Sequence, residues 1–199
     1  NKKFMKILKI ILPIIILFSL SLSCGNKKDE TIKIGAILPL TGDAALYGNN
    51  AKEGIDLAVE KINLKGGVLN KKIEIIYEDS KAEQTMGVSA FQKLLNVDKV
   101  QVVIGDISSS VTLSIVPIAE KNKIVVFSPA ATSPKLSGYS KYFFRNWTSD
   151  ADEVKYISDY AINKLSISKL GILYINNDYG KGMEEACKKE FIDKQKEVI

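Results

Sequence analysis

The stretch VQVVIGDISSSVTLSIVPIAEKNKIVVFSP, residues 100–129, decides the fold class of this 199-residue chain. It opens with an apolar run rich in β-branched residues over 100–104, continues with a helical pattern over 109–121, and returns to an apolar run over 124–127. A strand, a helix and a second strand in this order predict a βαβ unit, in which a right-handed crossover joins two parallel strands. Pro117 falls inside the helical pattern, where we expect it to interrupt the helix or to mark a kink.

The same alternation extends from this unit in both directions along the chain. Before it, strands are predicted at 32–38 and 73–77, and helices at 48–63 and 83–96. After it, strands are predicted at 142–145 and 170–175, helices at 150–165 and 180–194, and a further strand begins at 198. Strands alternating with helices predict an α/β fold with a mainly parallel sheet, in which ligands bind beyond the carboxyl ends of the strands.

Composition excludes several classes of function. The formal net charge is +5, but four of the 28 basic residues lie in the first nine positions, so the rest of the chain nearly balances its 23 acidic residues. We therefore expect no nucleic-acid partner. The chain has no histidine and two cysteines, which excludes a Ser-His-Asp or Cys-His triad and a His/Cys zinc site within these residues. It also lacks a nucleotide-binding glycine motif, and we expect neither a cofactor nor a metal.

Residues 1–23 have the order of an export signal. A lysine-rich start precedes an apolar run over 10–22, which is shorter than the roughly 20 residues of a membrane-spanning helix. Ser23-Cys24 is similar to the cleavage and lipidation site of bacterial lipoproteins, and residues 24–31 read as a polar tether. We predict an extracytoplasmic lipoprotein anchored to a membrane through Cys24. The alternative is an ordinary cleaved signal in which Cys24 has no role.

Three predicted strand-to-helix loops carry the small and hydroxylated residues expected of a binding site. They span residues 39–48, 105–110 and 128–134. Hydroxyls and backbone N–H groups at a helix start suit an anionic group such as a carboxylate. Other interpretations stay open at each loop. The serines at 108–110 could only cap a helix, residues 130–132 could form a plain turn, and Tyr47 could be an exposed aromatic rather than a lid.

The order of short motifs along the chain resembles that of one family. The motifs include Pro39-Leu40-Thr41-Gly42, Tyr47-Gly48, Tyr77-Glu78-Asp79, Val103-Ile104-Gly105, Ser108-Ser109-Ser110, Ser128-Pro129-Ala130-Ala131-Thr132, Phe143-Phe144-Arg145, Asp150 and Asp178-Tyr179-Gly180. Each is short, but their shared order over 32–193 is specific. The chain resembles the branched-chain amino-acid-binding family of type I periplasmic binding proteins.

The resemblance implies a fold of two Rossmann-like lobes that close on a ligand. The first lobe would span residues 32–147. Residues 148–199 would form the start of the second lobe, which is incomplete in this chain. The implied ligand is a free amino acid of the Leu/Ile/Val type, and the implied partners are the permease subunits of an ABC importer. Because the second lobe is partial, we expect it to expose apolar surface.

The resemblance also carries ligand-binding roles to six positions, which are Tyr47, Ser109, Ala130, Ala131, Thr132 and Tyr179. It implies that Ser109 and the loop at 130–132 hold the α-carboxylate and α-ammonium. Tyr47 would line the side-chain pocket from the first lobe, and Tyr179 would close over the ligand from the second. The acidic partner that the family uses for the ammonium is expected beyond residue 199.

Three functions compete at this point. The first is a solute-binding protein of an importer, without catalysis. The second is a sensor module of the same fold, which binds an amino acid or an amide. The third is an extracytoplasmic enzyme, which the absence of histidine and of an activated nucleophile disfavours.

Overall fold

The computed structural model describes residues 31–199. Three predictions fall outside this range: the signal peptide at 1–23, the lipidation of Cys24, and all but the last residue of the tether at 24–31. Among the helices of residues 31–199, none combines the length and the apolar character needed to cross a membrane.

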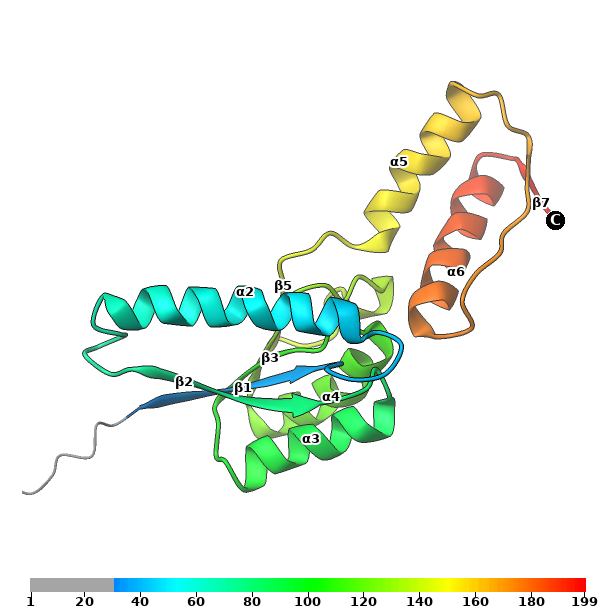
Figure 1. Cartoon of the computed structure of the whole chain (residues 1–199). Coiled ribbons are helices and arrows are strands. Elements are labelled where there is room, and N and C mark those ends of the chain that lie inside the picture. The colour runs from blue at the N-terminus through cyan, green and yellow to red at the C-terminus, as the bar shows by residue number, and fades with distance from the viewer. Residues whose placement is uncertain (1–30) are drawn as a thin grey trace, which may run out of the picture. The chain divides into compact units, whose positions relative to one another are not determined.

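Five parallel strands form the main sheet (Figure 1). The elements in chain order are β1 (Ile32–Leu38), α2 (Ala45–Leu64), β2 (Ile73–Asp79), α3 (Gln84–Asn96), β3 (Val102–Gly105), α4 (Ser109–Asn122), β4 (Val125–Ser128), the 3-10 helix η1 (Pro134–Leu136) and β5 (Phe143–Arg145). The strand order is β2-β1-β3-β4-β5, and every neighbouring pair is parallel. The prediction of an α/β fold with a mainly parallel sheet is confirmed.

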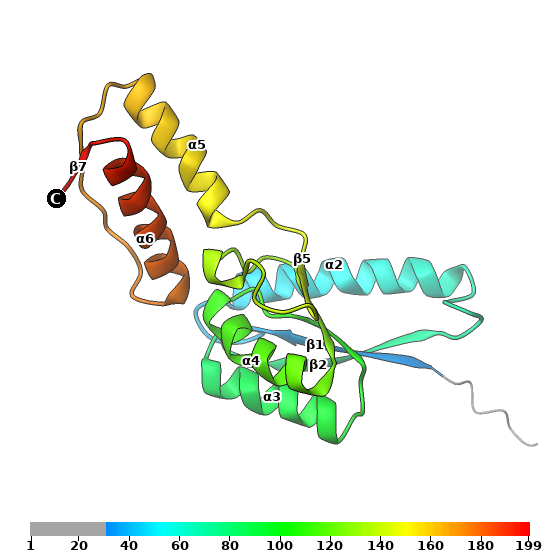
Figure 2. The ribbon, with the colours of Figure 1, turned by 180° about the vertical axis from the view of Figure 1, so that it is seen from behind.

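The two faces of this sheet are covered unequally. Helices α3 and α4 lie side by side on one face, and α2 crosses the other (Figures 1 and 2). The apolar core lies between the sheet and the α3–α4 layer; its largest fully buried side chains are Phe91, Ile37, Leu94, Ile115, Val100, Val103, Val111 and Val126. Helix α2 fully buries only Gly48. The α3–α4 face therefore supplies most of the apolar burial that stabilises the sheet.

Strand register brings the predicted binding loops together at one edge. Ile37 of β1 pairs with Gly105 of β3, and Ile104 of β3 pairs with Phe127 of β4. These three parallel strands therefore end at nearly the same level. The segments that follow them start at residues 39, 106 and 129, so they leave the sheet as neighbours.

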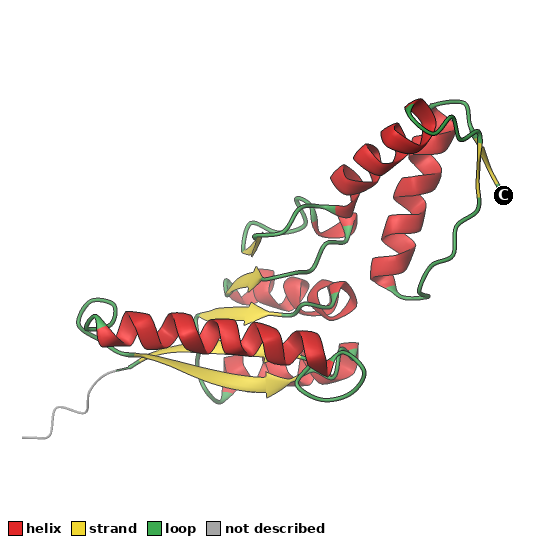
Figure 3. Cartoon of the chain, turned by 45° about the horizontal axis from the view of Figure 1, so that its top comes forward, coloured by secondary structure: helices red, strands yellow, loops and turns green. Residues whose placement is uncertain are grey.

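The rest of the described chain consists of two helices and a short second sheet. Its elements are α5 (Asp150–Asn163), β6 (Lys169–Leu170), α6 (Asp178–Asp193) and β7 (Glu197–Val198). Helices α5 and α6 pack against each other, and β6 pairs with β7 in parallel (Figure 3). The exposed apolar side chains of this part include Tyr156, Ile157, Tyr160, Leu173, Tyr174, Ile175 and Ile192. This part exposes apolar surface, as the sequence led us to expect.

Helix α4 runs from Ser109 to Asn122, close to its predicted range, so Pro117 does not interrupt it, and the kink at Pro117 stays a prediction. Two predicted elements differ from the structure by three residues or more. Helix α2 begins at Ala45, three residues before its predicted start. The strand predicted over 170–175 is wrong beyond Leu170, because in residues 31–199 its only partner is the two-residue β7. A strand needs a neighbour to satisfy its backbone N–H and C=O groups, and residues 171–175 have none in this range.

Candidate functional site

A cleft of about 710 Å³ opens at the carboxyl ends of the main-sheet strands. It is lined by Ala44, Tyr47, Ala51, Ala82, Ile107, Ser108, Ser109, Pro129, Ala130, Thr132, Trp147, Asp150, Glu153, Asn177 and Tyr179. A volume of this size suits a small organic ligand. The lining residues, which lie between positions 44 and 179, include two carboxylates and no Lys or Arg. An anionic group of a ligand would therefore depend on hydroxyl and N–H donors.

The first set of such donors lies at the start of α4. Gly105, at the end of β3, has a φ of +128°, and a Cβ there would meet the Ile37 carbonyl at 2.0 Å, so the turn into α4 requires glycine. Ser108 occupies the N-cap position, but its side chain makes no capping hydrogen bond. The Ser109 Oγ accepts a hydrogen bond from the Ser133 N–H at 3.2 Å, which leaves its own proton for a group in the cleft.

The loop after β4 forms the second wall, and its backbone is fixed from both sides. The Ser128 Oγ accepts the Ala131 N–H at 2.9 Å and the Ala130 N–H at 3.4 Å. The Arg145 guanidinium donates to the Ala131 carbonyl at 3.1 Å and to the Ser133 carbonyl at 3.0 Å. Both backbone groups of Ala131 are thus engaged inside the protein. Ala131 is fully buried and does not line the cleft.

A paired hydroxyl and carboxylate stand on the third side. The Thr132 Oγ1 donates to an oxygen of Asp150 at 2.9 Å, and the Asp150 N–H donates to the Thr132 carbonyl at 3.0 Å. Burial raises the pKa of the Asp150 carboxyl, although the Thr132 hydrogen bond opposes that shift. Because the Thr132 proton is given to Asp150, the hydroxyl oxygen is left as an acceptor. This pair is suited to a cationic group such as an ammonium.

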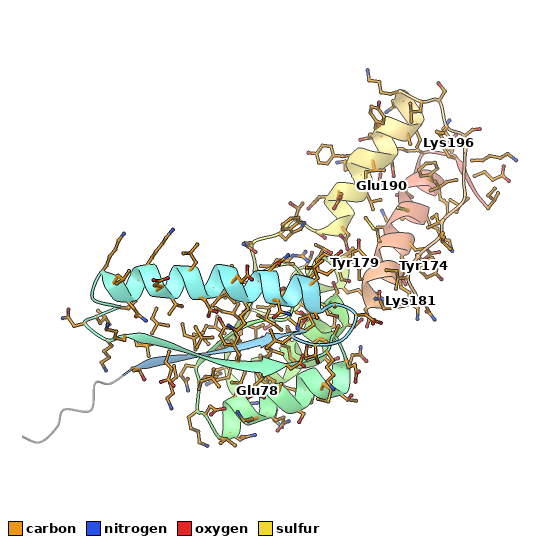
Figure 4. All side chains as sticks on the ribbon, in the orientation of Figure 1. Glu78, Tyr174, Tyr179, Lys181, Glu190 and Lys196 are labelled. Atoms are coloured by element: carbon orange, nitrogen blue, oxygen red, sulfur yellow. The ribbon has the colours of Figure 1, made fainter. Side chains whose placement is uncertain are left out.

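Aromatic side chains flank these polar groups. Tyr47 stands on the first turn of α2, Trp147 precedes α5, and Tyr179 stands on the first turn of α6. Figure 4 shows Tyr179 at the end of α6 nearest the start of α2, with Glu190 toward the opposite end. Burial, followed by the nearby carboxylates, raises the pKa of the Tyr179 phenol. The apolar faces of these rings can surround an apolar part of a ligand.

The structure therefore brings five of the six predicted ligand-binding residues to one cleft: Tyr47, Ser109, Ala130, Thr132 and Tyr179. Sequence reasoning did not assign a site role to Asp150, Glu153, Trp147 or Ile107. Asp150 belonged to the series of motifs, but an acidic residue at the start of a helix is also common because its negative charge stabilises the helix N-terminus. No group of three potential His, Cys, Asp or Glu metal ligands occurs within the described range.

Comparison with known proteins identifies the family. Residues 31–198 match the family model described as periplasmic binding protein. The chain belongs to this family. Its members are solute-binding proteins rather than enzymes, and the family implies an extracytoplasmic location. The family resemblance inferred from the sequence and the type I fold are confirmed.

Individual members of the periplasmic binding protein family extend the comparison. The Leu/Ile/Val-binding protein BraC3 of Rhizobium johnstonii is 32% identical over 84% of this chain and 46% of its own length. The branched-chain amino acid transporter substrate-binding protein LivJ of Streptococcus pneumoniae, solved with isoleucine, is 32% identical with a TM-score of 0.76, over 85% of this chain and 48% of that one. This chain thus spans about half the length of these relatives.

Another relative binds a different kind of solute. The solute-binding protein of an ABC transporter from Rhodopseudomonas palustris BisB5, solved with 3,4-dihydroxybenzoic acid, is 28% identical with a TM-score of 0.73. The match covers 85% of this chain and 46% of that one. Membership of the family therefore leaves open whether the solute carries an ammonium group.

Proposed function

We propose that this protein is the extracytoplasmic solute-binding component of an ABC importer and that it binds a free amino acid with an apolar side chain. The observation that carries the proposal is the chemistry of the cleft walls. Ser109 and the start of α4 offer donors to a carboxylate, while Asp150 and Thr132 offer acceptors to an ammonium. Burying a zwitterion is costly unless both charges are paired, and this cleft can pair both.

The position of Asp150 favours an amino acid over an aromatic acid. An aromatic carboxylate needs donors at one end and no acidic partner at the other. In this cleft Asp150 and the nearby Glu153 would face such a ligand without a cation to bind. An ammonium would instead gain a charge-assisted hydrogen bond. Asp150 thus offers the ammonium an acidic partner within residues 31–199.

The residue roles follow from this arrangement. Ser109 and the Ala130 backbone hold the polar end of the amino acid, Thr132 and Asp150 bind its ammonium, and Tyr47 contacts its side chain. Tyr179 covers the ligand from α6, and Trp147 adds an aromatic wall. A branched side chain of the Leu, Ile or Val type suits these walls, which support it through the rings and the methyl groups of small residues.

The partners and location are part of the same proposal. The permease subunits of the importer would receive the closed, loaded protein, and a lipid on Cys24 would hold the protein at the membrane. The lipid anchor is supported by the order of residues 1–24 in the sequence.

The test uses isothermal titration calorimetry. The protein, from Gly25 onward with all following sequence that its gene encodes, is titrated with leucine, isoleucine, valine and 3,4-dihydroxybenzoate while the heat of binding is recorded. We expect saturable changes with the amino acids and none with the aromatic acid. The Asp150→Asn variant should weaken amino-acid binding by about 10- to 100-fold, because it removes the charge that faces the ammonium.

Asp152→Asn is the matched control, because Asp152 is an exposed acid of the same helix turn that does not line the cleft. It should leave the dissociation constant within about twofold. Saturable binding of the aromatic acid that Asp150→Asn does not weaken would point to a solute without an ammonium. A wild-type protein that binds none of these ligands would remove the support for an amino-acid carrier.

A further inference from the structure

Asp106 is a buried carboxylate that does not line the cleft but lies directly behind its walls. It is fully buried, and it follows Gly105 at the end of β3. The Ser80 hydroxyl donates to one of its carboxylate oxygens at 2.5 Å, and the Ser108 N–H donates to the other at 2.6 Å. One side chain therefore joins the loop after β2 to the loop after β3.

The main chain of Asp106 reaches a third loop. Its carbonyl accepts hydrogen bonds from the Ser128 Oγ at 2.7 Å and from the Thr112 Oγ1 at 3.1 Å. Ser128 ends β4, and Thr112 belongs to α4. The same residue therefore connects the loops that follow β2, β3 and β4.

Two of these contacts continue to residues of the cleft wall. The Ser80 Oγ accepts the Ala82 N–H at 3.2 Å, and the Ser128 Oγ accepts the N–H groups of Ala130 and Ala131. Ala82 and Ala130 line the cleft on two different loops, and Ser108, which is bound directly, lines it on a third. Each of these three walls is therefore one or two hydrogen bonds away from Asp106.

The surroundings of Asp106 make its charge unusual. Burial raises the pKa of its carboxyl to about 6, and the Asp79 carboxylate adds to that rise, while the Ser108 and Ser80 hydrogen bonds oppose it. The groups that act on it from residues 31–199 include no cation. A buried carboxylate without a cationic partner is costly, and an apolar residue would avoid that cost.

We propose that Asp106 is a positioning residue, which holds three walls of the ligand cleft in their relative places through its carboxylate and its main-chain carbonyl. Only one part of this inference rests on the proposed function of the cleft, namely the effect of Asp106 on ligand affinity. The positioning itself concerns the three loops and can be measured without a ligand. The carboxylate fixes the peptide at position 106, and the orientation of that peptide fixes the carbonyl that holds Ser128.

The experiment compares Asp106→Ala and Asp106→Asn with the wild type, in the protein from Gly25 onward with all following sequence that its gene encodes. Amide hydrogen exchange is followed by NMR at Ala82, Ser108 and Ala131. We expect exchange to rise at least tenfold at all three amides in Asp106→Ala. Asp106→Asn keeps an acceptor for the Ser108 N–H, so it should restore slow exchange there and in part at Ala131.

Asp79→Asn is the matched control, because Asp79 also ends a strand and accepts backbone N–H groups of neighbouring loops. Its carboxylate binds the N–H groups of Leu40 and Lys81 and makes no hydrogen bond to the N–H groups of Ser108 or Ala131. It should speed exchange at those amides and leave Ser108 and Ala131 unchanged. If Asp106→Ala speeds exchange only at Ser108, Asp106 is a local cap and the proposal is overturned.

The effect on binding separates this proposal from the proposed function. Calorimetric titration with the amino acid that binds the wild type should show at least tenfold weaker binding for Asp106→Ala, with partial recovery for Asp106→Asn. If the wild type binds no solute, the proposed function fails, and the exchange data alone decide the positioning role. If Asp106→Ala does not fold, Ser80→Ala replaces it. Faster exchange is then expected at Ser108, whose N–H binds the same carboxylate, and an unchanged Ser108 amide would overturn the proposal.

Discussion

The segment 32–145 and the segment 150–199 share the same strand–helix alternation but bury very different amounts of apolar surface. In the first segment, β1 pairs with β2 over seven residues and with β3 on its other side, and a continuous core lies under the sheet. In the second, β6 and β7 pair over two residues, and Val154 and Phe191 are the fully buried apolar side chains. Alternation predicts the elements, but burial depends on how many neighbours each strand finds.

This difference has a consequence for local stability. Regions with few buried apolar contacts open at a lower free energy than a packed core. In a protein of residues 25–199, we therefore expect 150–199 to open locally while 32–145 stays folded. Asp150 and Tyr179 line the cleft from the segment with fewer buried apolar side chains. Within residues 31–199, the cleft thus lies between a well-packed segment and a sparsely packed one.

The largest expected effect comes from a pair of phenylalanine substitutions in residues 25–199. Phe91 is fully buried against the main sheet, and Phe191 is 2% exposed on α6. Phe91→Ala should lower the free energy of unfolding by about 3–5 kcal/mol, because it leaves a cavity in the main core. Phe191→Ala should lower it by less than about 1 kcal/mol, since α6 opens before the global transition. Denaturant unfolding combined with amide exchange measures both.

The two variants control for each other, because each removes the same ring from a buried site. In Phe191→Ala, exchange should rise in α5 and α6 and stay slow in β1 and β3. Equal losses of unfolding free energy for the two variants would show that the segments unfold as one unit, and the comparison would fail.

A smaller effect is expected from pH at Asp106. Because burial raises the pKa of this carboxyl from 3.8 to about 6, the folded state binds its proton more tightly than the unfolded state does. The stability that this group contributes is fully present below pH 3.8 and is lost as the pH rises through 6. Asp106→Asn should lack this dependence. The free energy of unfolding of the wild type minus that of the variant should therefore fall by up to about 1.4 kcal/mol per pH unit between pH 3.8 and about 6. Denaturant unfolding at a series of pH values measures the difference, and a constant difference would contradict the raised pKa.

The smallest effect concerns the contact between the two segments. The Gln84 side chain donates to the Asp178 carboxylate at 3.1 Å and to the Ser110 carbonyl at 3.4 Å, and the Asp178 N–H donates to the Ser110 Oγ at 3.1 Å. Gln84→Ala should cost at most about 1 kcal/mol, because the contact is exposed, and it should speed exchange of the Asp178 amide.

Gln92→Ala is the control for that substitution. Gln92 lies on the same helix, and its side chain accepts a hydrogen bond from Asn96 within that helix. It should leave the Asp178 amide unchanged. Equal effects of the two variants on this amide would show that Gln84 does not join the two segments.

Most of the main sheet was predictable, because its strands are apolar runs that end in turns. The strand predicted at 32–38 matches β1, and the paired strands around Asp106 were found within two residues. The prediction was wrong over 171–175, where Leu173 and Ile175 are apolar but have no strand to pair with within the described residues. An apolar pattern in a sequence indicates that a segment tends to be buried. Whether the segment pairs as a strand depends on neighbouring strands, which the pattern of that segment does not describe.

The cleft was predictable in part. Parallel strands place their carboxyl ends together, so the loops with Ser109 and Thr132 could be assigned to one site from the order of strands and helices alone. Two features could not be predicted: that Ala131 lies outside the cleft, and that Asp150 lines it. Each depends on which hydrogen bonds the residue makes. Ala131 is turned inward by Ser128 and Arg145, and Asp150 is turned toward Thr132.

Small residues in the cleft give the site room to change during evolution. Ala44, Ala51, Ala82 and Ala130 each present no more than a methyl group to the cleft. The network around Asp106 holds Ala130 by its backbone N–H group, so a larger side chain at this position leaves the network's bonds in place. A single substitution can therefore narrow the cavity without dismantling its scaffold. Under the proposed function, such substitutions would change which solute fits, while the hydrogen-bond network behind the cleft would stay the same.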